Sequence, residues 1–163
     1  MATPQPRPET SLQIRRMFTA SRTKVFEAWT QKEKLEKWMC RDNPKNSPRY
    51  TAFDVRPGGT NRMEISTADG NVYHQRVTFR EVKPPEKLVF TWAWERFSPS
   101  GQKEEEQDET LVTVEFHERG TWTEFVLTHE LFQTAEQRDR HSVGWNGCFD
   151  VLARALESTQ EST

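Results

Sequence analysis

The feature that most constrains this chain is a long series of strand-like segments followed by a single long helix. Apolar and polar residues alternate through residues 50–130, in segments separated by turn pairs such as Pro57-Gly58 and Asp69-Gly70. Alternation with a period of two is typical of strands that bury one face, and Asp-Gly is a strong signal for a two-residue hairpin turn. A helical pattern then covers about residues 135–157, and Thr134 with Gln137 has the spacing of a capping box at its start. Successive hairpins predict an antiparallel sheet, and one long helix predicts that a single face of it is covered.

Flanking segments complete the expected order of elements. Residues 12–18 alternate as a first strand, and Ser21 can cap a short helix. Thr30 with Glu33 has the spacing of a capping box and predicts a second short helix. The charged segment 98–109 is expected to be a long solvated hairpin loop. The remaining strands are expected over residues 50–55, 60–66, 72–82, 87–95, 110–118 and 121–130.

Length, charge and cysteine usage narrow the class of protein. The 163 residues suit one domain, which we expect over residues 11–157, with disordered tails at 1–10 and 158–163. The net charge of −2 gives no basic footprint for nucleic acid, and no apolar run approaches the roughly 20 residues of a membrane span. Cys40 and Cys148 lack metal-ligand or redox-pair spacing, which suits a reducing compartment. We therefore expect a cytoplasmic monomer or homodimer with no nucleic-acid partner and no membrane span.

Several segments, taken in order and spacing, resemble one known family. They are RRMFTASRTKVFEAWTQKEKLEKWM, FDVRPGG, DGNVY, VKPPEKLVFTWAW, TLVTVEF, TEFVLTHELF and GWNGCFDVLARAL. They resemble the family called activator of heat shock protein 90 ATPase homolog 1-like, in the START-like superfamily that is also called SRPBCC. The resemblance covers about residues 11–157. It implies an α+β helix-grip fold like that of the birch allergen, in which a curved antiparallel seven-stranded sheet wraps around a long C-terminal helix and two short helices follow the first strand.

For function the resemblance is less specific than for fold. Members of this superfamily bind lipids, hormones or other apolar ligands, or act as cyclases, and the helix-grip geometry leaves a cavity between sheet and helix. In the eukaryotic co-chaperones that name the family, a separate N-terminal domain supplies a main share of the chaperone contact. Only about ten residues precede the first expected strand here. Co-chaperone activity is therefore not carried over directly.

A row of large rings marks the face where such a cavity is expected. Trp92 and Trp94 share one face of the strand expected at 87–95, and Trp145 lies on the sheet-facing side of the long helix. The residues expected to line the cavity are Met63, Tyr73, Phe90, Trp92, Trp94, Phe125, Leu127, His129, His141, Trp145 and Phe149. Two interpretations stay open, because these rings can either fill a solid core or surround a small apolar or aromatic ligand. Gly144, at the edge of the same helix face, either lets the helix approach the sheet or leaves room for a ligand.

No metal, cofactor or catalytic residue is assigned from the sequence. The four histidines lack metal-ligand spacing, and there is no nucleophile elbow, phosphate loop or dinucleotide fingerprint. His129 and His141 are both expected to face inward, where they either orient a ligand or bond to backbone at the cavity rim. General acid–base chemistry by these two histidines, Arg62 or Glu64 remains open.

Three hypotheses follow from these patterns. The first is a non-enzymatic START-like protein that holds a small hydrophobic ligand, lipid-like or aromatic, in a cavity between the sheet and the C-terminal helix. The second is an interaction module that acts on a chaperone ATPase, with a role in the stress response. The third is a cyclase or dehydratase-like enzyme that uses the inward His129 and His141.

Overall fold

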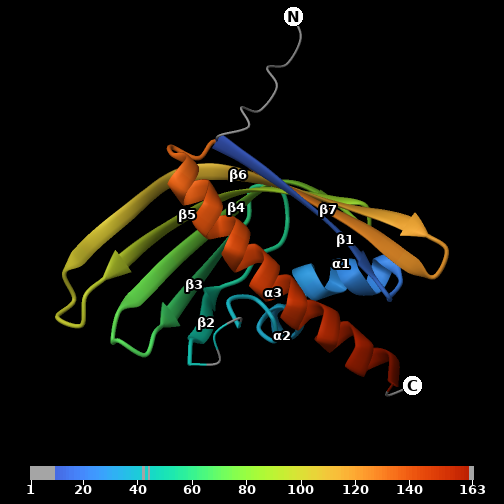
Figure 1. The fold of residues 1–163 in the computed structure, drawn as a ribbon, viewed down its shortest axis with the longest axis horizontal. Coiled ribbons are helices and arrows are strands. Elements are labelled where there is room, and N and C mark those ends of the chain that lie inside the picture. Colours follow the sequence, from blue (N-terminus) through green and yellow to red (C-terminus); the bar gives the residue numbers. More distant parts are fainter. Residues whose placement is uncertain (1–9, 42, 44, 162–163) are drawn as a thin grey trace, which may run out of the picture.

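A curved antiparallel sheet wraps around one long helix in the computed structural model, which describes residues 10–41, 43 and 45–161, with side chains as far as Glu157 (Figure 1). The seven strands lie in the order β1-β7-β6-β5-β4-β3-β2. Their bounds are β1 (Ser11–Phe18), β2 (Ser47–Ala52), β3 (Thr60–Ser66), β4 (Val72–Lys83), β5 (Lys87–Phe97), β6 (Lys103–Arg119) and β7 (Trp122–Glu130). The α+β helix-grip architecture expected from the sequence is therefore confirmed.

All three helices lie on the concave side of the sheet (Figure 1). They are α1 (Arg22–Thr30), α2 (Lys32–Leu35) and α3 (Ala135–Glu161). α3 continues four residues beyond the expected end at Glu157, and the expected N-terminal tail lies outside the described residues except for Thr10. None of the helices in the described part of the chain has the length and hydropathy needed to cross a membrane.

Two of the three helix caps expected from the sequence are correct. The Ser21 hydroxyl accepts a hydrogen bond from the Lys24 N–H at 3.3 Å, and the Thr134 hydroxyl accepts one from the Gln137 N–H at 3.1 Å. The capping box expected at Thr30 is wrong. Its hydroxyl donates back to the Phe26 carbonyl at 3.0 Å, and the residue that precedes α2 makes no side-chain cap. A threonine hydroxyl inside a helix commonly bonds to the carbonyl four residues earlier, and here this local bond takes the place of a cap.

The charged segment expected to be a long loop is largely strand. β6 begins at Lys103, so the turn after β5 is short, and residues 103–109 pair with the end of β5. Arg96 and Glu105 form a cross-strand ion pair at 3.3 Å, and Lys103 contacts both Glu95 and Glu106 within 3.6 Å. Opposite charges on facing strand positions attract each other. These pairs explain why a charge run that suggests a solvated loop adopts strand structure.

Smaller differences concern the turns. β2 covers Ser47–Ala52 instead of the expected residues 50–55, and the β3–β4 connection takes residues 67–71 rather than two residues. Gly70 in that connection has φ +88°, which explains the glycine. In the loop before β3, a side chain at Gly59 would clash with the Asp54 carbonyl, so only glycine fits there.

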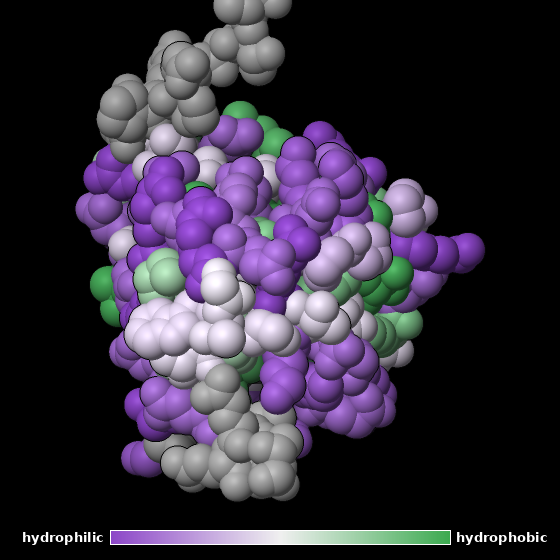
Figure 2. All heavy atoms as spheres, turned by 90° about the vertical axis from the view of Figure 1, so that its right-hand side faces the viewer, coloured by the Kyte–Doolittle hydropathy of each residue, from purple (hydrophilic) through white to green (hydrophobic). Residues whose placement is uncertain are grey.

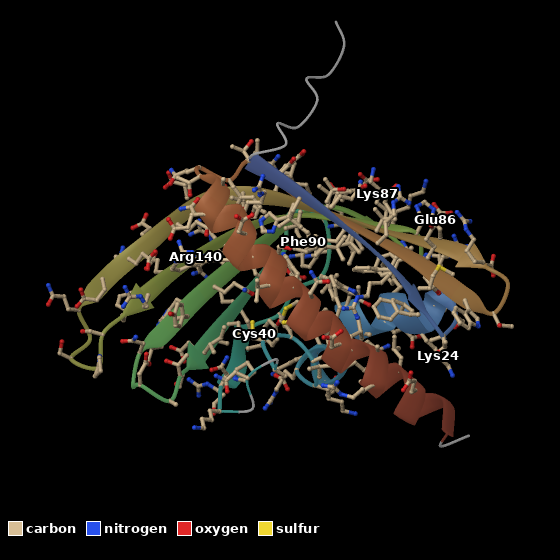
Figure 3. All side chains as sticks on the ribbon, in the orientation of Figure 1. Lys24, Cys40, Glu86, Lys87, Phe90 and Arg140 are labelled. Carbon is tan, nitrogen blue, oxygen red and sulfur yellow. The ribbon has the colours of Figure 1, made fainter. Side chains whose placement is uncertain are left out.

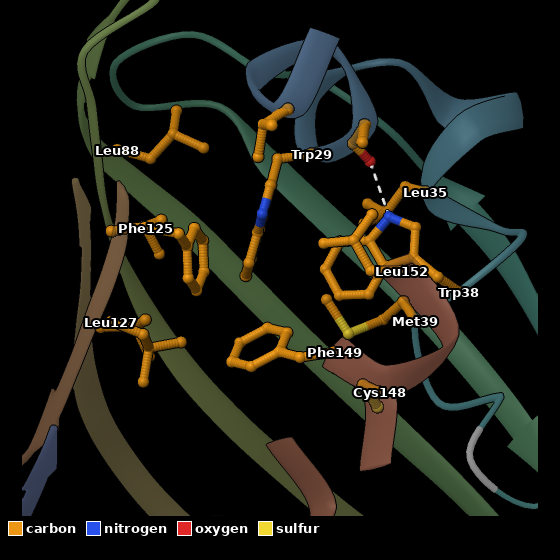
Figure 4. Close-up of a cluster of buried hydrophobic side chains, with 14 of the residues drawn as sticks. Trp29, Leu35, Trp38, Met39, Leu88, Phe125, Leu127, Cys148, Phe149 and Leu152 are labelled. Atoms are coloured by element: carbon orange, nitrogen blue, oxygen red, sulfur yellow. Dashed lines mark hydrogen bonds between the residues drawn. The ribbon is translucent and has the colours of Figure 1, made fainter. Parts of the chain in front are cut away.

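The core lies between α1, α3 and the concave face of the sheet (Figure 4). Trp29 of α1 stands at its centre, with ring centroids 4.8 Å from Trp38, 5.8 Å from Phe125 and 6.3 Å from Phe149. The Trp38 indole N–H donates to the Ala28 carbonyl at 2.9 Å. Edge-to-face and offset rings at these distances pack densely. The surface around α1 and the β6–β7 turn is mostly hydrophilic (Figure 2).

Candidate functional site

A cavity of about 280 Å³ lies between the first half of α3 and the neighbouring part of the sheet. Strands β3 to β6, the segment after α2 and one side of α3 contribute to its wall. The lining residues are Met39, Cys40, Ile65, Tyr73, Gln75, Trp92, Trp94, Glu105, Arg140, His141, Gly144, Trp145 and Cys148. The aromatic and sulfur-containing side chains make the wall mainly apolar, which is typical of small-molecule sites.

Gly144 leaves open a part of the cavity that a larger side chain at this position of α3 would fill. It lies in the interior of α3 and lines the cavity, and a Cβ atom built on it would meet no atom within 4 Å. Of the two roles considered for this glycine, the structure favours room beside the helix over a close approach to the sheet. The loop after α2 closes the cavity nearby, where the Cys40 N–H donates to the Cys148 Sγ at 3.3 Å.

The eleven residues expected to line a cavity divide into two groups. Five of the expected residues lie in the cavity wall, namely Tyr73, Trp92, Trp94, His141 and Trp145. The other six pack in the core rather than in this wall, and they are Met63, Phe90, Phe125, Leu127, His129 and Phe149. The ring centroids of Phe125 and Phe149, for example, are 4.9 Å apart, and both side chains are fully buried. One end of the space between sheet and helix is therefore solid, and the other contains the cavity.

Several lining residues were missed by the sequence patterns. Met39 and Cys40 follow a short helix, where no periodicity shows which way a side chain points. Glu105 falls in the segment expected to be loop. Gln75 could have been found, because it is two residues from Tyr73 on the same strand and must share its face.

His129 is held in a buried chain of hydrogen bonds. The Trp145 indole N–H donates to its Nδ1 at 3.0 Å, and its Nε2 lies 2.7 Å from the Thr110 hydroxyl. Because an indole can only donate, Nδ1 is the acceptor and the proton of the neutral ring is on Nε2, which donates to Thr110. The hydroxyl then donates to the Trp92 carbonyl at 3.0 Å. Both ring nitrogens are therefore used by the protein itself.

Burial sets the protonation state of His129. Its side chain is fully buried, and desolvation, with a smaller contribution from His141, lowers its pKa well below the ordinary 6.5. The ring is therefore neutral at pH 7, as the hydrogen-bond chain requires. The ring does not line the cavity, and its two hydrogen bonds hold the side chains of Trp145 and Thr110 in place.

His141 is placed differently, although its ring centroid is 5.2 Å from that of His129. It lines the cavity, and its Nδ1 donates to the Gln137 carbonyl at 2.8 Å. Desolvation lowers the pKa of His141, and the charge of Arg140 lowers it further, while the bond to Gln137 opposes the shift. The neutral ring leaves the Nε2 lone pair as a possible acceptor at the cavity wall.

The other groups considered for acid–base chemistry lie elsewhere. Arg62 and Glu64 line a separate polar groove of about 500 Å³, together with His74. Glu64 is paired with Arg49 at 2.6 Å, and this hydrogen bond lowers its pKa. Arg62 and Glu64 therefore do not share the cavity, and neither nitrogen of His129 is free, so none of these three groups can act together with His141 there. Within the described residues, no group of three or more His, Cys, Asp or Glu side chains is arranged to hold a metal ion.

The cavity wall carries two charged side chains, Glu105 and Arg140. Arg140 projects from the first half of α3, and the lining residue Cys40 lies below the helix in the loop that follows α2 (Figure 3). Glu105 already pairs with Arg96 at 3.3 Å. Arg140 makes no ion pair or hydrogen bond with another described residue. An unpaired cation at the rim of an apolar cavity favours a ligand with a negative end.

Comparison with known proteins agrees with this fold. The model of the family described as Activator of Hsp90 ATPase homolog 1-like protein matches residues 19–157. The Mll3558 protein of Rhizobium loti has a similar structure, with 22% identity, a TM-score of 0.72, and coverage of 90% of this chain and 96% of that one. The AHSA1 protein of Silicibacter pomeroyi has 21% identity, a TM-score of 0.75, and coverage of 91% and 99%. Protein CV1439 of Chromobacterium violaceum has 18% identity, a TM-score of 0.77, and coverage of 91% and 98%. No curated protein matches the chain.

Proposed function

The chain belongs to the Activator of Hsp90 ATPase homolog 1-like family, and on this premise we propose that it is a non-enzymatic START-like protein that binds a small hydrophobic molecule. The ligand, lipid-like or aromatic, occupies the cavity between the sheet and α3, and the protein works in the cytoplasm as a monomer or homodimer. The cavity of about 280 Å³ carries this proposal. Its volume is close to the lower end of the roughly 300–1,000 Å³ of ordinary small-molecule sites.

Native mass spectrometry of freshly purified protein tests the proposal, because it reports a bound molecule and the number of subunits together. Naphthalene provides a second test, since its binding should change the fluorescence of Trp92, Trp94 and Trp145 in the wall. Gly144→Leu fills the cavity and should abolish both signals. Val143→Leu is the matched control on the same helix, because Val143 is 76% exposed. Naphthalene binding that is absent in the wild type, with no molecule co-purified, contradicts the proposal.

A second candidate is an interaction with a chaperone ATPase in the stress response. The description of the matching family, Activator of Hsp90 ATPase homolog 1-like protein, is the observation in its favour. Purified protein should then co-elute with the chaperone and raise its rate of ATP hydrolysis. An unchanged rate at saturating concentration excludes this function.

The cyclase or dehydratase hypothesis has less support. It depended on two inward histidines, and only His141 of the pair lines the cavity. His129 is bonded through both nitrogens.

A further inference from the structure

On the basis of the proposed function, we propose that the cavity selects a compact aromatic acid with a hydroxyl or carbonyl oxygen at its buried end. Gln75 and Trp92 bind that oxygen, and Arg140 binds the carboxylate at the rim. All three residues line the mainly apolar cavity, in which Gln75 and Trp92 are buried and Arg140 is exposed.

The first observation is a buried indole N–H without an acceptor in the cavity wall, together with the amide of Gln75 in the same wall. Trp92 is 7% exposed, and its indole N–H finds no acceptor among the described residues. Gln75 lies in the same wall and is also 7% exposed, and its side-chain amide makes no hydrogen bond to another described residue, although it is not one of the fully buried unpartnered groups. Buried polar groups without partners are costly, and native proteins contain few of them. Together an N–H donor and an amide match a hydroxyl, which accepts from the indole and exchanges hydrogen bonds with the amide.

The second observation is a small chamber beside this pair. It has a volume of about 20 Å³ and shares Met39, Gln75 and Trp92 with the main cavity. Trp29 also lines it, and the Trp29 indole N–H is likewise buried without an acceptor. This volume exceeds the roughly 10–15 Å³ that holds one water-sized group. The chamber therefore has room for a single oxygen, and two residues of its wall each carry a buried indole N–H without an acceptor.

The middle and the rim of the cavity define the rest of the ligand. Trp145 and Trp92, whose rings lie 4.8 Å apart, offer aromatic surfaces to a flat ring. At the rim, Arg140 is the charged lining group without an ion-pair partner among the described residues. A guanidinium matches the geometry of a carboxylate.

Volume limits the size of the ligand. About 280 Å³ is close to the lower end of the roughly 300–1,000 Å³ of ordinary small-molecule sites. A single aromatic ring with a short acidic arm is of this size, whereas a long acyl chain would extend into solvent. The ligand is therefore closer to an aromatic acid than to a membrane lipid.

Isothermal titration calorimetry with three probes tests the inference. 4-Hydroxycinnamate carries both polar ends, cinnamate lacks the ring oxygen, and methyl 4-hydroxycinnamate lacks the charge. We expect cinnamate to bind about tenfold more weakly than 4-hydroxycinnamate, because the buried hydrogen bond is lost. The methyl ester should bind about two- to fivefold more weakly, because the ion pair at an exposed rim is modest.

Variants assign each contact. Trp92→Phe keeps an aromatic ring but removes the N–H, so it should weaken 4-hydroxycinnamate binding more than cinnamate binding and abolish the preference between the two acids. Gln75→Leu should reduce the same preference. Arg140→Gln should remove the difference between acid and ester, whereas Arg154→Gln, an exposed change on the same helix, should retain it.

The outcomes separate this inference from the proposed function. If naphthalene binds but cinnamate and 4-hydroxycinnamate bind equally, the cavity accepts ligands and the inference is wrong. Equal weakening of both acids by Trp92→Phe also overturns it, because that result indicates only damaged packing. If neither naphthalene nor a co-purified molecule is found, the proposed function fails and the inference fails with it.

Discussion

Replacing Gly144 by alanine is expected to stabilise the protein, although the residue lies in the wall of the candidate site. Gly144 is an interior residue of α3, and alanine is favoured over glycine in a helix interior by about 0.8–1.0 kcal/mol. The added Cβ meets no atom within 4 Å, so no steric cost offsets this gain. The free energy of unfolding should therefore rise by about 1 kcal/mol, which raises the Tm of a chain of this length by about 2–4 °C.

Thermal and urea unfolding followed by circular dichroism measure this effect. Val143→Ala is the control, since it improves helix propensity at a position that is 76% exposed and outside the cavity wall. It should add no more than about 0.7 kcal/mol and leave ligand binding unchanged. The alanine at 144 should weaken binding of the aromatic probes, because its methyl group takes up part of the cavity.

A loss of stability in Gly144→Ala would refute the reasoning. It would show that the helix lies closer to the sheet than the structure indicates, so that the glycine serves packing and the cavity is smaller. A gain in stability with unchanged probe binding would also count against a ligand beside Gly144. The expected combination is higher stability with weaker binding, as is common where a site limits stability.

Three further predictions follow from the core. Thr110→Val should lower the free energy of unfolding by about 1–3 kcal/mol, because it leaves the buried His129 Nε2–H and the Trp92 carbonyl without their shared partner. Thr113→Val, on the same strand, is the control, and equal effects in urea titrations would refute the hydrogen-bond chain. Stability should also fall as pH drops below about 6.5, since burial lowers the pKa of folded His129 while the unfolded chain takes up the proton. The slope should reach about 1.4 kcal/mol per pH unit for this histidine, and urea titrations from pH 8 to 5.5 should give a shallower slope in His129→Gln. Phe125→Ala should cost about 3–5 kcal/mol in chemical denaturation, because the ring is fully buried in the solid end of the core; a cost below 1 kcal/mol would place a void there.

The elements and their buried faces could be predicted largely from local patterns, while the helix-grip arrangement was implied by the family resemblance. The alternation of β5 placed Phe90 and Trp92 on the concave face, and the period of α3 placed Trp145 and Phe149 toward the sheet, as the structure confirms. Such patterns succeed because a strand or helix buries one face, and its period shows which face that is. The charged segment 103–109 was misjudged because its stability as a strand depends on ion pairs with β5, which no local pattern shows.

The candidate site could be predicted only in part. Sequence identified an inward face of rings, but it could not distinguish Trp92, in the cavity wall, from Phe125, in the solid core. That difference depends on how tightly the helix packs at each end of the sheet. The polar groups were still less visible, because Gln75 and Arg140 look like ordinary polar residues along the chain.

By itself, the sequence determined the order of elements, the covered face of the sheet and the place of Gly144 on the edge of that face. Only the tertiary structure decided that this glycine leaves open space, that His129 is bonded through both nitrogens, and that His141 lines a cavity that His129 does not. The physical reason is the distance along the chain between the residues that interact. Periodicity and capping act over a few neighbouring residues, whereas a cavity and a buried hydrogen-bond chain depend on where elements far apart in the chain come to lie against each other.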